Sequence, residues 1–134
     1  MQDKLMDLKV IKFRIDQLLQ TGSMAYGFKN PQDDDRYCGF NEFNEIKTIL
    51  VDLGVEINKK SSSSDHGIIF QLDGVVYNLF WVPAEQLENI RICTCVLTAI
   101  YRCGGPVANK LENNKLFRIV IFRVVGDILS AFGG

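Results

Sequence analysis

The chain lacks an excess of either charge. Its 15 Lys and Arg residues and 16 Asp and Glu residues leave a formal net charge of −1. This balance excludes electrostatic attraction of nucleic acid by the whole surface, although a local basic patch is still compatible with it. The chain also lacks the run of about 18 uncharged apolar residues that a membrane span requires. The longest candidate, residues 116–132, is interrupted by Arg118, Arg123 and Asp127.

Cysteines are also few. Four of them in 134 residues are not a dense disulfide framework, which favours a reducing compartment. The first residues carry Asp3, Lys4 and Asp7 and no apolar signal segment, so we expect a cytoplasmic protein without membrane association. What is present is the composition of a globular domain, 47% hydrophobic and 23% charged, which excludes a disordered chain. The length favours a single domain over residues 1–134 with its own core.

Hydrophobic periodicity and turn residues predict alternating helices and strands, and thus an α/β fold of the α+β type. The dipeptide Asp73-Gly74 between two β-branched runs is typical of a type I′ hairpin turn. A loop is expected over 59–65, and a strand over 119–125 is the alternative to the last helix. The expected elements are a helix over 5–19, a strand over 36–40, a helix from 41–44 to 53, a strand over 55–58, hairpin strands over 67–72 and 75–82, and helices over 83–103, 107–112 and 115–132.

Residues 21–35 are expected to form a loop, and they hold the most informative motif. Gly22 and Ser23 follow a predicted helix, where backbone N–H groups and a hydroxyl can contact phosphate oxygens. The consecutive carboxylates Asp33, Asp34 and Asp35 follow about a dozen residues later and can hold Mg²⁺ against the same phosphates. Phosphoryl transfer needs this combination of phosphate cradle and metal. The alternative is a solvated surface loop.

This motif resembles a known family. The run Thr21-Gly22-Ser23-Met24-Ala25-Tyr26-Gly27, then Asn30-Pro31 and the aspartates, is similar to the opening of the nucleotidyltransferase superfamily, above all its small bacteriophage forms. The resemblance extends weakly to residues 75–80, to the helix containing Thr94 and Thr98, and to residues 114–118. It implies a minimal nucleotidyltransferase-like fold, a mixed sheet flanked by helices, with an Asp-x-Asp pair that binds the catalytic metal.

The chain departs from the family pattern at two positions. Counted from Gly22 and Pro31, the two metal-binding positions fall on Asp34 and Arg36. A shift by one residue places them on Asp33 and Asp35 instead. The third family carboxylate falls on Asn78, which brings no charge. Without two well-placed carboxylates, two-metal phosphoryl transfer is severely weakened.

We therefore expect a catalytically degenerate nucleotidyltransferase-like protein, a pseudoenzyme that binds a nucleotide, a nucleic acid or a protein partner. A phage protein that acts on a host factor in the host cytoplasm fits this description. The alternatives are an active Mg²⁺-dependent enzyme that transfers a nucleoside monophosphate, and an unrelated protein-interaction module. The resemblance implies these candidate residues: Gly22 and Ser23 for phosphate, and Asp33, Asp34 and Asp35 for catalysis and Mg²⁺.

Four further expectations follow. Gly22 and Ser23 should lie within about 10 Å of the aspartates, with Asn78 beside them, and the family pattern requires Asn78 and Asp34 on one face of the sheet. The change Leu79→Ala should destabilise a buried strand by about 2–5 kcal/mol, whereas Asp34→Ala should have little effect. The apolar last helix is either a core helix or half of a homodimer interface. Cys38, Cys93, Cys95 and Cys103 are expected to be buried thiols, not metal ligands.

Overall fold

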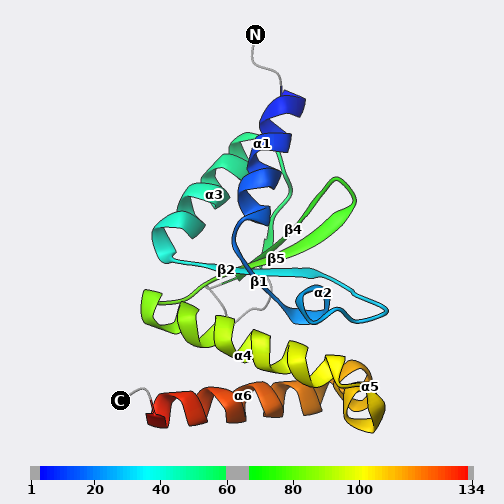
Figure 1. The fold of residues 1–134 in the computed structure, drawn as a ribbon. Helices are drawn as coiled ribbons and strands as arrows, with labels where there is room; N and C mark the ends of the chain where they lie inside the picture. The colour runs from blue at the N-terminus through cyan, green and yellow to red at the C-terminus, as the bar shows by residue number, and fades with distance from the viewer. Residues whose placement is uncertain (1–3, 60–66, 133–134) are drawn as a thin grey trace.

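The computed structural model describes residues 4–59 and 67–132, and it has an α+β fold with six helices and five strands in these ranges. Figure 1 shows the chain passing from helix to sheet and back several times. The elements in chain order are α1 (Lys4–Asp16), β1 (Leu19–Thr21), α2 (Gly22–Tyr26), β2 (Asp34–Cys38), α3 (Phe40–Asp52), β3 (Asn58–Lys59), β4 (Gly67–Leu72), β5 (Val75–Trp81), α4 (Ala84–Arg102), α5 (Gly105–Asn113) and α6 (Lys115–Phe132).

The strands form one mixed sheet in the order β1-β2-β5-β4-β3. β2 and β5 are parallel neighbours at its centre, with Asp35 paired to Asn78, and the other neighbouring strands are antiparallel. The β4–β5 hairpin turns at Asp73 and Gly74, whose φ angles of 50° and 77° are those of the expected type I′ turn. Successive side chains of a strand point to opposite faces, so the β2–β5 pairing decides which residues meet on each side of the sheet.

The main hydrophobic core lies between one face of the sheet and the helices α1 and α3. Both helices cover this face in Figure 1. Each of them places apolar residues three and four positions apart toward the strands, as an amphipathic helix does. The buried members of this cluster are Ile11, Ile15, Cys38, Phe43, Ile46, Leu50, Ile68, Phe70, Leu72, Tyr77 and Leu79.

The opposite side of the molecule is helical and two layers deep. α4 contacts β1 and β2, and α6 runs along α4 as the outermost layer (Figure 1). A second, smaller apolar cluster holds α2, α4, α5 and α6 together through the buried residues Tyr26, Phe28, Leu97 and Leu111. None of the helices in the described ranges is long and apolar enough to cross a membrane.

The structure corrects part of the expected secondary structure. The region 21–35 is not all loop, because β1 pairs with β2 and the five-residue helix α2 follows it. Residues 119–125 lie inside α6, so the alternative of a strand there is wrong. Most of the loop expected over 59–65 lies outside the described residues.

The expectation for the thiols is correct for two cysteines and wrong for two. Cys38 and Cys93 are buried, but Cys95 and Cys103 are exposed. Cys93 and Cys95 point in nearly opposite directions because neighbours two positions apart on an α-helix are about 200° apart.

Candidate ligand-binding pocket

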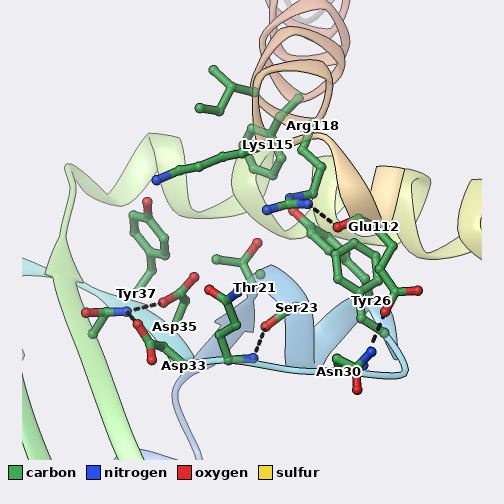
Figure 2. A pocket seen from close by; sticks show the side chains of 16 residues that line it. Thr21, Ser23, Tyr26, Asn30, Asp33, Asp35, Tyr37, Glu112, Lys115 and Arg118 are labelled. Atoms are coloured by element: carbon green, nitrogen blue, oxygen red, sulfur yellow. Dashed lines mark hydrogen bonds between the residues drawn. The ribbon is translucent and has the colours of Figure 1, made fainter. Parts of the chain in front are cut away.

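A pocket of about 350 Å³ opens where the end of β1 and the start of β2 meet the start of α6. It lies on the face of the sheet that α4 covers, opposite α1 and α3, and is drawn in Figure 2. Residues far apart in the sequence converge on it. The residues used below are Gly22, Ser23, Gln32, Asp33, Asp35, Tyr37, Asn78, Lys115, Arg118, Ile119 and Phe122.

Two aspartates and an asparagine form the acidic wall of this pocket. Asp33, Asp35 and Tyr37 alternate along the chain and therefore face the same side of the sheet. The Asn78 side-chain amide nitrogen donates hydrogen bonds to Asp33 Oδ2 at 3.0 Å and to Asp35 Oδ1 at 2.7 Å. Asn78 is 1% exposed, and its Oδ1 atom is buried without a hydrogen-bond partner in the part of the chain that the structure describes. A neutral amide thus occupies the space between two carboxylates.

Gly22 brings the start of α2 directly against this wall. Its φ angle is +82°, a left-handed conformation that glycine adopts without strain. A Cβ atom at this position would overlap the carboxylate of Asp35, so only glycine permits the close approach. The distance expected between the Gly-Ser motif and the aspartates is therefore confirmed for Asp35. The neighbouring Ser23 Oγ accepts a hydrogen bond from the backbone N–H of Gln32 at 3.0 Å, which fixes the loop that leads to Asp33.

The start of α6 supplies positive charge across the pocket. Lys115 is exposed, and Figure 2 shows its side chain extending toward Tyr37. Arg118 donates two hydrogen bonds of 2.8 Å to the carbonyl oxygens of Leu111 and Glu112, and its guanidinium lies 5.4 Å from the centre of the Phe28 ring. Arg118 is thus held by the end of α5, whereas the ammonium of Lys115 points into the open part of the pocket.

Tyr37 contributes an un-ionised phenol. Burial, together with the nearby charge of Asp35, raises its pKa to about 12. Its ring stacks on Phe80 of β5 with centroids 5.0 Å apart. At neutral pH, Tyr37 therefore presents a rigid aromatic surface with a hydroxyl that can donate a hydrogen bond to a ligand.

Asp34 and Arg36 lie on the other face of β2, away from the pocket. Arg36 forms a bidentate ion pair with Asp34, with Nε–Oδ1 2.7 Å and Nη2–Oδ2 3.1 Å, and both residues are buried. Arg36 also donates to the carbonyl oxygens of Asp16 and Leu18 at 2.9 and 3.0 Å. Arg36 thus balances the charge of Asp34 on this face of the sheet and does not neutralise the pocket carboxylates Asp33 and Asp35.

This placement corrects the alignment to the family pattern. Asn78 and Asp34 face opposite sides of the sheet, because Asn78 pairs with Asp35 in the parallel β2–β5 ladder. The form of the resemblance that begins on Asp34 and Arg36 is therefore wrong. Asp33, Asp35 and Asn78, the residues of the shifted form, lie together on the pocket side, but the condition that the family pattern placed on Asp34 and Asn78 is not met. Asp34 is a structural residue and not part of the pocket.

A metal ion would have a limited set of ligands here. Among residues 4–59 and 67–132, no group of three or more His, Cys, Asp and Glu side chains is placed to hold one. Asp33 and Asp35 provide two carboxylates, and Mg²⁺ in phosphate-binding sites is commonly held by one or two carboxylates together with the phosphates themselves. The unpartnered Oδ1 of Asn78 is a third oxygen, but the side-chain amide would have to rotate to bring this atom toward the two carboxylates. The donor set fits one Mg²⁺, with less negative charge than a site of three carboxylates.

Sequence reasoning found only part of this pocket. Tyr37 and Gln32 carry no local motif that marks them as pocket residues, and Lys115 lies in the segment 114–118, to which the resemblance extended only weakly and without a role for it. The alternation of Tyr37 with Asp33 and Asp35 was a usable signal, since residues two apart on a strand share a face. Comparisons of the chain with protein-family models, with curated proteins and with solved structures give no match.

Proposed function

We propose that this protein binds a nucleotide, as a complex with Mg²⁺, in the pocket between β2 and α6, and that it does not efficiently transfer the nucleotide. The observation that carries the proposal is the bridge that Asn78 forms between Asp33 and Asp35, in a pocket that also holds Gly22, Ser23 and Lys115. Of the family resemblance, the proposal keeps the pair Asp33 and Asp35 and not the form that begins on Asp34 and Arg36.

The charges explain why phosphate and metal would bind together. Asp33 and Asp35 would repel phosphate oxygens unless a cation lay between the carboxylates and the phosphate. A divalent cation on the two carboxylates removes this repulsion, and Lys115 adds a positive charge on the opposite side. The Ser23 hydroxyl, which accepts from Gln32, can still donate its own hydrogen to a phosphate oxygen.

The remaining walls suit the other parts of a nucleotide. Ile119 and Phe122 of α6 form an apolar side of the pocket on which a base can pack. The hydroxyl of Tyr37, un-ionised at neutral pH, can donate to a ribose or phosphate oxygen. These contacts explain binding without assigning any group to proton abstraction.

Loss of transfer follows from the identity of the third residue. When bound, Mg²⁺ would neutralise phosphate charge and orient the phosphates. Transfer through two metals needs enough negative charge to hold both ions about 4 Å apart. The neutral side chain of Asn78 stands at the third position, so the pocket offers two carboxylates instead of three.

An active transferase is the second candidate. It is favoured by one specific observation, that both members of an Asp-x-Asp pair, Asp33 and Asp35, face the pocket beside Ser23. The change Asn78→Asp separates the two candidates. If the unmodified protein is a binder, Asn78→Asp should leave or strengthen Mg²⁺-dependent binding and increase any release of pyrophosphate from a nucleoside triphosphate. If the unmodified protein is the enzyme, it should already release pyrophosphate with a suitable acceptor.

Binding is tested by thermal unfolding and calorimetry with Mg²⁺ and each of the four ribonucleoside triphosphates. We expect at least one nucleotide to raise the melting temperature only when Mg²⁺ is present, because a ligand that binds the native state alone adds RT ln(1 + [L]/Kd) to stability. Asp35→Asn and Lys115→Ala should abolish or weaken this rise. Asp52→Asn, which removes an exposed carboxylate of α3, is the matched control and should leave it unchanged. No Mg²⁺-dependent rise with any nucleotide would refute the proposal.

A further inference from the structure

The segment that carries Gly22 and Ser23 is held from outside the pocket, by the helix α4. Thr21 is the last residue of β1 and comes directly before α2, and it lines the pocket together with Ser23 (Figure 2). The hydroxyl oxygen of Thr21 lies 2.7 Å from that of Thr94 on α4, and both side chains are buried. Thr94 lies behind Thr21 and does not itself line the pocket.

The other hydrogen bond of Thr94 decides which of the two hydroxyls donates. Thr94 donates its only hydroxyl hydrogen to the carbonyl oxygen of Ile90, one turn earlier on α4, at 2.7 Å. In the contact between the two threonines, Thr94 Oγ1 therefore accepts and Thr21 donates. A threonine in the position before a helix commonly caps that helix with its hydroxyl, but the side chain of Thr21 makes no such bond to α2. The Thr21 hydroxyl joins β1 to α4 instead.

This hydrogen bond acts at the point where the chain turns toward the acidic wall. The next residue, Gly22, has a φ angle of +82° and lies so close to Asp35 that a Cβ atom would overlap the carboxylate. A small displacement of Thr21 would therefore change how Gly22 approaches Asp35. The far end of α2 is held by the apolar cluster around Tyr26, and apolar contacts are not directional. A hydrogen bond, in contrast, restricts both a distance and an angle.

We propose that Thr94 is a positioning residue of the pocket. Its hydroxyl accepts from Thr21 and so holds Gly22 and Ser23 where they can contact phosphate, while Thr94 itself does not touch the ligand. The inference rests on the proposed nucleotide binding and adds a role for α4, a helix that supplies none of the residues lining the pocket.

The affinity for each of the four ribonucleoside triphosphates, measured by calorimetry with Mg²⁺, tests this role. Thr94→Val keeps nearly the same shape but removes the acceptor, so we expect the dissociation constant to rise about tenfold. Thr94→Ser keeps the hydroxyl and should bind within about threefold of the unmodified protein.

Thr98→Val is the matched control on the same helix. Thr98 donates the same kind of bond, to the carbonyl oxygen of Thr94 at 2.7 Å, and its contact with α2 is a long one of 3.5 Å to the carbonyl oxygen of Ala25. Thr98→Val therefore removes an equivalent bond within α4 without touching Thr21, and it should leave the affinity unchanged.

A double substitution tests whether Thr94 acts through Thr21. Thr21→Val removes the donor of the same hydrogen bond, so the addition of Thr94→Val should weaken nucleotide binding no further. Two independent effects on the pocket would instead multiply the dissociation constant. A double variant that binds more weakly than Thr21→Val by the full factor of Thr94→Val would contradict the proposed route.

Amide hydrogen exchange gives a readout that needs no nucleotide. The backbone N–H of Gln32 donates to Ser23 Oγ, so its exchange rate reports whether Ser23 is in place. We expect Thr94→Val to accelerate this exchange at least about threefold by local opening, and Thr94→Ser and Thr98→Val to leave it unchanged.

The two measurements separate this inference from the function on which it rests. Failure of the unmodified protein to bind any of the nucleotides would refute the proposed function, and the exchange rates would still decide whether Thr94 holds Ser23. Nucleotide affinity that Thr94→Val leaves unchanged, or Gln32 exchange that it leaves unchanged, would overturn the positioning role of Thr94.

Discussion

Two neighbouring aspartates on β2 show how one position along a strand changes the role of a residue. The side chain of Asp34 turns toward α1, where it is buried against Arg36. The side chain of Asp35 turns toward the pocket, where it lies against Gly22 and accepts a hydrogen bond from Asn78. The strand alternates faces, so the first carboxylate belongs to the core and the second to the candidate site.

At this scale we expect Asp34→Ala to destabilise the protein by about 3–5 kcal/mol, the range for breaking a buried ion pair. The reason is that Arg36 would remain buried with only the more distant carboxylate of Asp16, at 3.8 Å, to balance its charge. This result would be as large as the loss of about 2–5 kcal/mol expected for Leu79→Ala, a fully buried residue of β5. It reverses the small effect expected from the sequence, where Asp34 looked like one of three solvated loop carboxylates. Denaturant midpoints at neutral pH measure both losses.

Asp35→Asn is the control for that comparison, since it changes the neighbouring carboxylate on the opposite face. The amide oxygen that replaces the carboxylate can still accept the hydrogen bond from Asn78, so the loss should stay within about 1 kcal/mol. An unchanged midpoint in Asp34→Ala would contradict a stabilising role for the buried pair.

At the scale of elements, the end of α1 is tied to the sheet by a polar cluster. Arg36 of β2 donates to two carbonyl oxygens at this end of the helix, those of Asp16 and Leu18. The Asp16 carboxylate accepts hydrogen bonds from the Tyr77 hydroxyl at 2.8 Å and from Lys12 at 2.9 Å. The cluster satisfies carbonyl groups that a helix end leaves without partners, and it joins α1 to both central strands.

This cluster makes the stability of the protein depend on pH. Partial burial alone would raise the pKa of Asp16, but the hydrogen bonds from Lys12 and Tyr77 and the charge of Arg36 lower it below its ordinary value. A carboxyl with a lowered folded pKa stabilises the native state above its unfolded pKa of about 3.9, and this stabilisation is lost as the pH falls through the folded value. We therefore expect the unfolding free energy of Asp16→Asn to fall less steeply below pH 4 than that of the unmodified protein.

Urea denaturation from pH 7 down to pH 2.5 measures this dependence. Asp52→Asn serves as a control because Asp52 is an exposed residue of α3, and its slope should match that of the unmodified protein. Identical slopes for all three proteins would show that the Asp16 cluster contributes nothing to acid unfolding.

Elements whose signals are local could be predicted from the sequence. The β4–β5 hairpin, α3, α4 and α6 each carry their own periodicity and turn residues, and all were predicted within a few residues of their bounds. β1 and α2 were missed for a physical reason. β1 is three residues long and exists because it pairs with β2, and α2 is a five-residue helix with no amphipathic pattern of its own.

At the scale of the whole molecule, the candidate site could be predicted only in part. The motif residues Gly22, Ser23, Asp33 and Asp35 were found because they are close in sequence. The contact of Asp33 and Asp35 with Asn78 required the parallel β2–β5 register, which joins segments more than 40 residues apart across three intervening elements, α3, β3 and β4. Periodicity does not report such a register. The contribution of α6 likewise depends on how the helical layers stack.

The same layering divides the four cysteines into two buried and two exposed thiols, and the buried thiols can report on opening of the fold. Cys38 lies in the main core, where burial raises its pKa to about 12. Burial on α4 also raises the pKa of Cys93. Cys95 and Cys103 are exposed on the opposite side and at the end of the same helix. Only a thiolate that a reagent can reach reacts. The buried thiols should therefore react more slowly than the exposed ones, because they are both less ionised and less accessible.

With a coloured disulfide reagent at pH 8 we therefore expect two thiols to react quickly in the native protein and two slowly. Cys95→Ser and Cys103→Ser should each remove one fast equivalent and leave the slow phase unchanged. Leu79→Ala should accelerate the slow phase. Cys38 becomes accessible only when the packing between α1, α3 and the sheet opens, and the substitution of Leu79 lowers the free energy of this opening. Four thiols that react at one rate in the native protein would contradict the burial of Cys38 and Cys93. A slow phase that Leu79→Ala does not alter would show instead that these two thiols are exposed by local motion rather than by opening of the core.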